Sequence, residues 1–114
     1  MTTGASHILA FSTSNYEAML KFLRDFGFTV HPHDQLTPFF ERGRGVRLSR
    51  GELEFQLEES DDPKRRAFFN LFLTDFSDEE LERVQALGYK AKQEFSIYGE
   101  FHSIQTPDGG MCVL

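Results

Sequence analysis

Residues 19–28 read MLKFLRDFGF and decide the fold, because they combine an apolar helical stripe with a glycine stop. Apolar side chains recur at helical spacing from Tyr16 to Phe26, which predicts a helix with one buried face. Gly27 follows at the position where helices commonly end in a left-handed residue. The stretch therefore predicts a helix that stops after Phe26 and returns the chain to a strand at Phe28.

The segments around this helix predict a strand before it and strands after it. Ser14 and Glu17 fit a capping box, in which the Ser14 hydroxyl accepts from the Glu17 N–H and the Glu17 side chain reaches back. Arg50-Gly51 predicts a hairpin turn, and Pro32 to Gly45 reads as an irregular loop. The predicted strands of this half are His7–Ser12, Phe28–Val30, Val46–Ser49 and Leu53–Glu58.

The second half of the chain repeats this order. Ser77 and Glu80 form a second capping box, and the helix exit Leu87-Gly88-Tyr89 matches Phe26-Gly27-Phe28. A hairpin turn is predicted at Gly99, and residues 60–66 read as the linker between the halves. The predicted strands are Ala67–Leu73, Glu94–Tyr98, Phe101–Gln105 and Met111–Leu114. We therefore expect an α+β fold, a single domain over residues 1–114 built from two strand–helix–strand–strand–strand modules at approximately 5–60 and 66–114.

Composition bounds the class of protein. A chain of 114 residues has room for one core, and its 13 Phe residues against 3 Tyr and no Trp can fill that core, line a pocket, or both. The formal net charge of −6 argues against a nucleic-acid partner. Cys112 is the single cysteine, which excludes an intrachain disulfide and a cysteine-based zinc site. The absence of a long apolar run predicts no signal peptide and no membrane span, hence a cytoplasmic protein.

The pattern resembles the vicinal oxygen chelate superfamily, which groups glyoxalases, bleomycin resistance proteins and extradiol dioxygenases. The resemblance is carried by His7 at the first strand, by the exit of the helix at residues 19–28, and by Thr106-Pro107-Asp108-Gly109-Gly110 near the end. It implies two modules whose sheets curl around a cleft. In compact members that cleft is assembled from modules of two chains, so the resemblance also implies a homodimer.

The resemblance implies four positions that hold a divalent metal in the metal-dependent members. His7 falls on the first, and Glu54 or Gln56 on the second, whereas the other two fall on Phe68 and Val113, which cannot bind a metal. This favours the metal-free branch, whose bleomycin resistance proteins bind a drug between two chains and catalyse nothing. We therefore expect no catalytic residues and no cofactor; a metal, if any bound, would use His7 and Glu54. The alternative is a divalent-metal-dependent lyase or dioxygenase with a rearranged site, in which His102 could also take part.

The leading functional hypothesis is binding of a small organic molecule, suited by the acidic chain to a cationic, partly planar ligand. If the register of the family holds, Phe68, Asn70 and Phe72 face the cleft, while Phe69, Leu71 and Leu73 pack under the helices. A third hypothesis is an interaction module whose phenylalanines fill the cleft themselves. Parity does not decide whether His102 faces the cleft. The candidate ligand-binding residues are His7, Phe11, Glu54, Gln56, Phe68, Asn70, Phe72, His102 and Val113.

Overall fold

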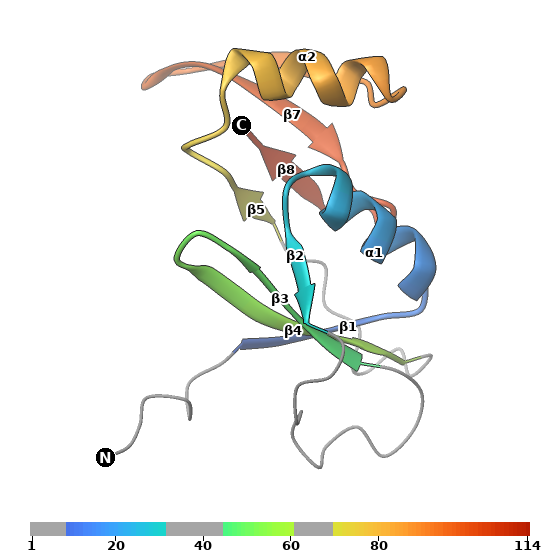
Figure 1. Cartoon of the computed structure of the whole chain (residues 1–114). Coiled ribbons are helices and arrows are strands. Elements are labelled where there is room, and N and C mark those ends of the chain that lie inside the picture. Colours follow the sequence, from blue (N-terminus) through green and yellow to red (C-terminus); the bar gives the residue numbers. More distant parts are fainter. Residues whose placement is uncertain (1–8, 32–44, 61–69) are drawn as a thin grey trace, which may run out of the picture. The chain divides into compact units, whose positions relative to one another are not determined.

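The structure is a computed structural model that describes residues 9–31, 45–60 and 70–114. Two compact units make up the chain, unit 1 at Met1–Ala67 and unit 2 at Phe68–Leu114. In Figure 1 the elements of unit 1 run from blue to green and those of unit 2 from yellow to red. Each unit contains a strand, a helix and three further strands, in that order. The predicted α+β fold of two such modules is therefore confirmed.

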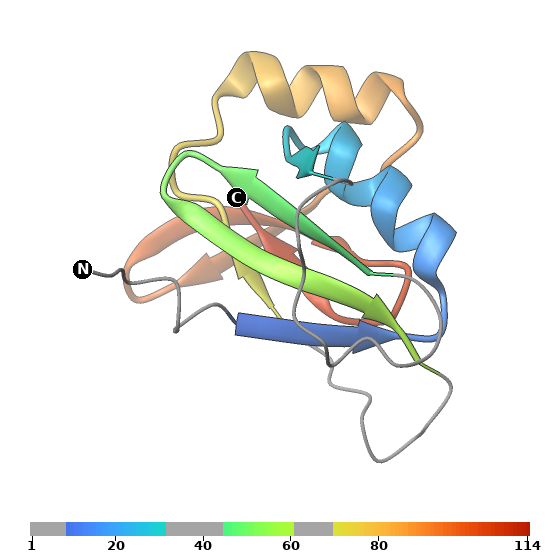
Figure 2. The same cartoon turned by 60° about the horizontal axis from the view of Figure 1, so that its bottom comes forward.

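Unit 1 forms a four-stranded mixed sheet in the order β1-β4-β3-β2. The first strand runs parallel to β4, and the remaining neighbours are antiparallel. In Figure 2 the long β3–β4 hairpin, drawn in green, lies beside β1 in blue. The elements are β1 (Leu9–Thr13), α1 (Tyr16–Asp25), β2 (Thr29–His31), β3 (Gly45–Arg50) and β4 (Leu53–Glu59). The hairpin turns at Gly51, which has φ +58°, as the sequence predicted. Residues 32–44 of the predicted loop Pro32 to Gly45 lie outside the described residues, and its last residue, Gly45, is the first residue of β3.

The start of α1 corrects one prediction. Asn15, not Ser14, is the N-cap residue, and it makes no side-chain cap hydrogen bond. Because the helix begins one residue later than predicted, Glu17 is its second residue and cannot form the reciprocal bond of a capping box. The Thr13 hydroxyl instead accepts from the Asn15 backbone N–H at 2.9 Å. The predicted capping box at Ser14 is wrong.

Both helices end as their glycines predicted. In unit 1 the Phe28 N–H donates to the Leu23 carbonyl at 2.9 Å, and Gly27 has φ +93°. In unit 2 the Tyr89 N–H donates to the Val84 carbonyl at 3.2 Å, and Gly88 has φ +106°. Both exits are Schellman motifs, in which a left-handed glycine lets the chain cap its own last carbonyls.

The core of unit 1 is aromatic. The rings of Phe22 and Phe26 stack with centroids 4.3 Å apart, and Phe28 meets Phe55 edge-on at 5.5 Å. All four side chains are buried. The Arg50 Nη1 donates to the Phe26 carbonyl at 3.2 Å, which ties the end of α1 to β3. The apolar stripe of the helix and one face of the sheet therefore make this core, as amphipathic periodicity predicts.

Unit 2 repeats the strand order of unit 1, as β5-β8-β7-β6, with β5 parallel to β8. The elements are β5 (Leu71–Phe72), α2 (Asp78–Ala86), β6 (Lys92–Ser96), β7 (Gly99–Gln105) and β8 (Met111–Val113). The capping box of α2 is confirmed, because the Glu80 N–H donates to the Ser77 hydroxyl at 3.1 Å and the Ser77 N–H donates to the Glu80 carboxylate at 3.4 Å.

Two strand predictions in unit 2 need correction. The first strand spans only two residues of the described chain, Leu71 and Phe72, and residues 67–69 lie outside it. The turn between β6 and β7 lies at Ile97-Tyr98, because Gly99 already pairs with Ser96. The core of unit 2 is aliphatic rather than aromatic. It consists of Leu71, Leu73, Val84, Ile104 and Cys112. In the described ranges, no helix is long and apolar enough to cross a membrane.

Candidate functional site

The sheet of unit 1 has one apolar and one polar face. Strand register places Val46 and Leu48 of β3 on the same face as Leu57 and Phe55 of β4, and all four are buried. Side chains alternate along a strand, so the intervening residues share the other face. We call that face the polar sheet face. Its members are Ala10, Ser12, Thr29, His31, Arg47, Ser49, Glu54, Gln56 and Glu58.

A buried serine–carboxylate pair lies at one side of the polar sheet face. Ser12 and Glu58 are register partners in the parallel β1–β4 pair. The Ser12 hydroxyl donates to Glu58 Oε1 at 2.6 Å, and the two residues are only 7% and 9% exposed. A hydrogen bond from a hydroxyl to an ionised carboxylate is short and strong. This pair therefore fixes a carboxylate at a set position on the sheet.

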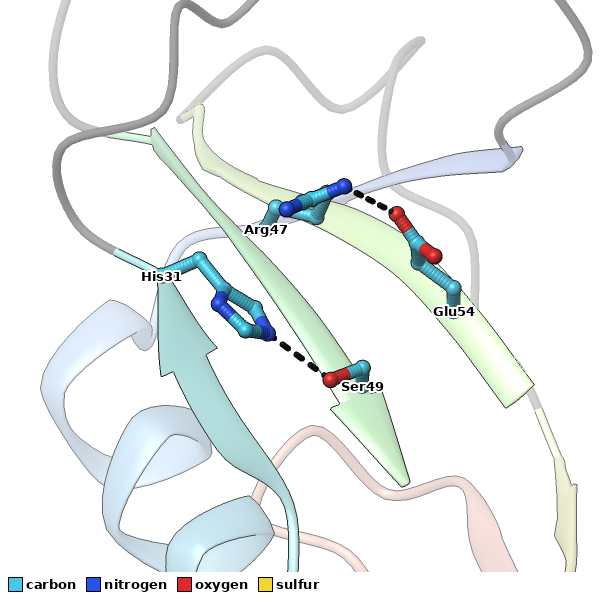
Figure 3. Close-up of polar contacts among 4 residues, drawn as sticks. All are labelled: His31, Arg47, Ser49 and Glu54. Carbon is cyan, nitrogen blue, oxygen red and sulfur yellow. Dashed lines mark hydrogen bonds and ion pairs between the residues drawn. The ribbon is translucent and has the colours of Figure 1, made fainter. Parts of the chain in front are cut away.

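Two further polar contacts cross the strands of this face (Figure 3). Arg47 Nη1 lies 2.6 Å from Glu54 Oε1, forming an ion pair between β3 and β4. His31 Nε2 lies 2.8 Å from the Ser49 hydroxyl, and the imidazole tautomer decides which of the two donates. The guanidinium of Arg47 therefore neutralises the carboxylate of Glu54. A metal ion bound by Glu54 would have to compete with this ion pair.

Gln56 lies between these contacts and is 6% exposed. Its register partners are Ala10 on one side and Arg47 on the other. Within the described part of the chain, its side-chain amide makes no hydrogen bond. A buried amide is normally paired with protein, water or ligand, so this group is available for a polar partner.

The sheet of unit 2 exposes several apolar side chains on the face away from its aliphatic core. Register places Phe72, Val113 and Ser103 on one face, with Met111 alternating onto it from β8. Phe72 is 65% exposed, Met111 is 44% exposed and Val113 is half-buried. We call Phe72, Met111, Val113 and Phe101 the apolar sheet face. The polar residues Ser103, Gln105, Lys92 and Glu94 lie on the same side of the sheet. Single exposed apolar residues are ordinary, but a group on one face commonly marks an interaction site.

Asn70 and Phe72 confirm the predicted alternation at the start of unit 2. Leu71 and Leu73 are buried, whereas Asn70 and Phe72 are exposed. The Asn70 side-chain oxygen accepts from the Met111 backbone N–H at 3.1 Å. The Asn70 amide is therefore paired with the backbone of the neighbouring strand β8.

The predicted site residues divide between several surfaces. Glu54 and Gln56 share the polar sheet face of unit 1. Phe11 lies on the other face, where its ring meets Phe55 edge-on with centroids 5.6 Å apart. In unit 2, Phe72 and Val113 are register partners. The remaining candidates are not placed with them.

His102, which is half-buried, shares a face with Ile104 and so points away from the apolar sheet face. His7 and Phe68 lie outside the described residues.

The donors on these faces do not fit a divalent metal centre. Among residues 9–31, 45–60 and 70–114, no group of three or more His, Cys, Asp or Glu is placed to hold one. Glu54 is paired with Arg47, and Glu58 accepts from Ser12. A hard divalent cation prefers several oxygen ligands, which the apolar Val113 cannot supply.

Sequence reasoning missed the residues that give the polar sheet face its character. Glu58 continues the alternation of Glu54 and Gln56, so its facing could have been inferred from the same strand. Ser12 and Arg47 could not, because only the register of β1, β3 and β4 brings them beside these groups.

Comparison of the sequence finds no match to a family profile or to a curated protein. The structure, in contrast, is similar to many solved structures. TnmS3, an antibiotic binding protein from Streptomyces sp. CB03234, has a TM-score of 0.66 and 24% identity, covering 99% of this chain and 97% of that one. A bleomycin-binding protein complexed with bleomycin has a TM-score of 0.61 and 19% identity, covering 96% and 95%. The fosfomycin resistance protein FosX from Mesorhizobium loti has a TM-score of 0.63 and 17% identity, covering 99% and 91%.

Proposed function

The chain has the glyoxalase/bleomycin resistance fold of the vicinal oxygen chelate proteins, and we propose that it binds a small organic molecule without converting it. One observation carries the proposal. Phe72 and Met111 stand exposed beside the half-buried Val113 on one face of the second sheet, while the aliphatic core lies on the other. An aromatic or apolar ligand placed there removes exposed apolar surface from water.

The physical gain from such a ligand is substantial. Burying apolar surface contributes about 25 cal/mol for each Å². An aromatic ring stacked on Phe72 adds a preferred offset or edge-on geometry. Val113 and Phe101, which are half-buried, add further apolar surface on the same face as Phe72. The apolar sheet face is therefore suited to a flat apolar or aromatic group.

The charge of the chain favours a cationic ligand. The formal net charge is −6, and the polar sheet face of unit 1 holds the carboxylates of Glu54 and Glu58. Arg47 pairs with Glu54, and Ser12 donates to Glu58, so these carboxylates contribute to the negative field of the chain while their side chains are held in place. An acidic protein also attracts cations by its long-range field.

Two of the structurally similar proteins support binding of a small organic molecule. TnmS3 is an antibiotic binding protein, and the bleomycin-binding protein forms a complex with bleomycin. We propose sequestration of this kind here, with no catalytic residue and no cofactor. Phe72 and Val113 are its first ligand contacts.

Isothermal titration calorimetry tests the proposal with three probes: bleomycin, the planar cation acridine orange and the planar anion 1-naphthalenesulfonate. We expect the cationic probes to bind more tightly than the anion. Phe72→Ala should lower the affinity for acridine orange by about tenfold, which corresponds to the loss of one aromatic stacking contact.

Phe95→Ala is the matched control, because Phe95 is 72% exposed and lies on the other face of the same sheet. It should leave the affinity unchanged. Binding of none of the probes, or equal losses in the two variants, would contradict the proposal.

The metal-dependent alternative has no supporting observation in the described residues, and calorimetry separates it from sequestration. We expect Mn²⁺, Ni²⁺ and Zn²⁺ to give no tight one-to-one binding. Tight binding that disappears in His7→Ala would instead support a rearranged metal site and overturn the metal-free proposal.

A further inference from the structure

Among the residues that the structure describes, Met111 is the one exposed side chain that contains sulfur. It lies at the start of β8 and is 44% exposed, whereas Met19 and Cys112 are fully buried. Met1 lies outside the described residues. Because exposure governs how readily an oxidant reaches a sulfur atom, a dissolved oxidant attacks Met111 before Met19.

Met111 belongs to the apolar sheet face that the proposed ligand covers. It precedes Val113 by two residues in β8, so the two side chains point to the same side of the sheet. Phe72 is the register partner of Val113, which makes Phe72 a diagonal neighbour of Met111. Long side chains and aromatic rings reach each other across such a diagonal. A chemical change at the Met111 sulfur therefore acts on the surface that Phe72 exposes.

Two side-chain amides flank Met111 from the neighbouring segments. The Asn70 oxygen accepts from the Met111 backbone N–H at 3.1 Å, which leaves the Asn70 NH2 group as a donor beside this residue. On the other side, Gln105 of β7 is the register partner of Met111, and its exposed amide carries a second NH2 group. A thioether sulfur is only a weak acceptor for these donors. The oxygen of a methionine sulfoxide is a strong one, so the surroundings of Met111 accommodate its oxidised form.

We propose that Met111 is a site of reversible oxidation by peroxides, and that its sulfoxide lowers the affinity of the apolar sheet face for ligand. A lone pair of the sulfur attacks one oxygen of hydrogen peroxide, and the O–O bond breaks as the S–O bond forms. The departing hydroxide takes the proton of the transferred hydroxyl group and leaves as water. The thioether is thereby oxidised by two electrons and the peroxide is reduced. The effect on affinity rests on the proposed function, whereas the oxidation itself rests on the exposure of Met111.

The sulfoxide opposes binding because it is polar where the reduced side chain is apolar. An apolar ligand that covers it must remove a hydrated S–O group from water, and this removal costs free energy. Hydrogen bonds from Asn70 and Gln105 hold the sulfoxide oxygen on the sheet beside Phe72. We therefore expect oxidation to lower the affinity for a planar ligand by about tenfold or more.

Peptide mass spectrometry after graded treatment with hydrogen peroxide tests where the chain is oxidised. In the folded chain, Met111 should form sulfoxide at least about tenfold faster than Met19, which reacts only when unit 1 opens. In urea the two rates should become similar. Equal rates in the folded chain, or a faster reaction at Met19, would overturn the proposal.

Isothermal titration calorimetry with acridine orange, after removal of the peroxide, tests the effect on affinity. The oxidised wild-type chain should bind about tenfold more weakly than before treatment, and methionine sulfoxide reductases should restore the original affinity. Met111→Leu removes the thioether, so peroxide should leave the affinity of this variant where it was before treatment. Met19→Leu is the matched control, and it should lose affinity on oxidation as the wild type does.

Circular dichroism of the oxidised chain separates a local change from unfolding, and loss of the folded spectrum would overturn the proposal. An equal loss of affinity in oxidised Met111→Leu would assign the effect to another residue and would overturn it as well. So would an unchanged affinity in a wild-type chain whose Met111 is fully oxidised. If the untreated chain does not bind the probe, the proposed function fails and the effect on affinity with it, while mass spectrometry still decides the oxidation site.

Discussion

Units 1 and 2 share one strand order but use phenylalanine differently. Phe22, Phe26 and Phe55 of unit 1 are buried, whereas Phe72 and Phe95 of unit 2 are exposed and its core is aliphatic. None of the described phenylalanines of unit 2 is buried. The fold therefore does not require aromatic side chains in this core, and the exposed rings of unit 2 are free to contact other molecules.

The faces opposite the two cores differ as well. Unit 1 presents a charged face held by contacts between its own side chains, such as Ser12 with Glu58 and Arg47 with Glu54. Unit 2 presents Phe72, Met111 and Val113. The two units thus differ in surface chemistry while sharing one strand order, as expected when surface residues vary on a common fold.

The largest expected effect comes from removing one phenylalanine in each unit. Phe55→Ala should lower the free energy of unfolding by about 3–5 kcal/mol, because it leaves a cavity between Phe11 and Phe28. Phe72→Ala should cost about 1 kcal/mol or less, since most of this side chain already contacts solvent. Urea denaturation followed by circular dichroism measures both values. Similar losses would mean that Phe72 is a core residue and not a surface for ligand.

The next effect concerns two buried serines. Ser12→Ala removes the hydroxyl that donates to the buried Glu58 carboxylate, and it should cost about 1–3 kcal/mol. Ser103 of unit 2 is buried as well, but its hydroxyl makes no hydrogen bond to another described residue. Ser103→Ala should therefore be nearly neutral. The same urea denaturation measures the loss of unfolding free energy in both variants. Equal losses would show that the Ser12–Glu58 hydrogen bond does not contribute to stability.

A smaller effect distinguishes the two helix exits. Gly27 and Gly88 both have positive φ, so alanine at either should cost about 1 kcal/mol in backbone strain. At Gly27 the new methyl group also meets Arg50 Nη1, which holds the Phe26 carbonyl, whereas nothing lies within 4 Å at Gly88. Gly27→Ala should therefore be the more destabilising. When Arg50→Ala is also present, Gly27→Ala and Gly88→Ala should destabilise the protein by more similar amounts. An unchanged difference between the two would mean that it arises from the backbone conformation and not from the contact with Arg50.

The parts of the fold set by local chemistry were predictable from sequence. Gly27 and Gly88 ended their helices because only a left-handed residue closes a Schellman motif. The confirmed pattern Asn70-Leu71-Phe72-Leu73 needed only the two-residue period of a strand. His102 could not be assigned a face from its own sequence, because its facing depends on the pairing of β7 with β8. The contacts of Ser12 and Arg47 depend on strand register between distant segments, which no local pattern contains.

The smallest expected effect concerns the capping-box pattern, whose prediction was correct for α2 in unit 2 and wrong for α1 in unit 1. Both helices are preceded by a serine with a glutamate three residues later, yet only Ser77 accepts from its partner's N–H, at 3.1 Å. Ser77→Ala should cost about 1 kcal/mol, the usual value of an N-cap. Ser14→Ala should change stability by no more than about 0.5 kcal/mol, as for an ordinary surface site, because Ser14 is exposed and Asn15 occupies the cap. Thermal unfolding of both variants measures the difference. A loss at Ser14 equal to that at Ser77 would place the start of α1 one residue earlier and restore the symmetry of the two modules at this position.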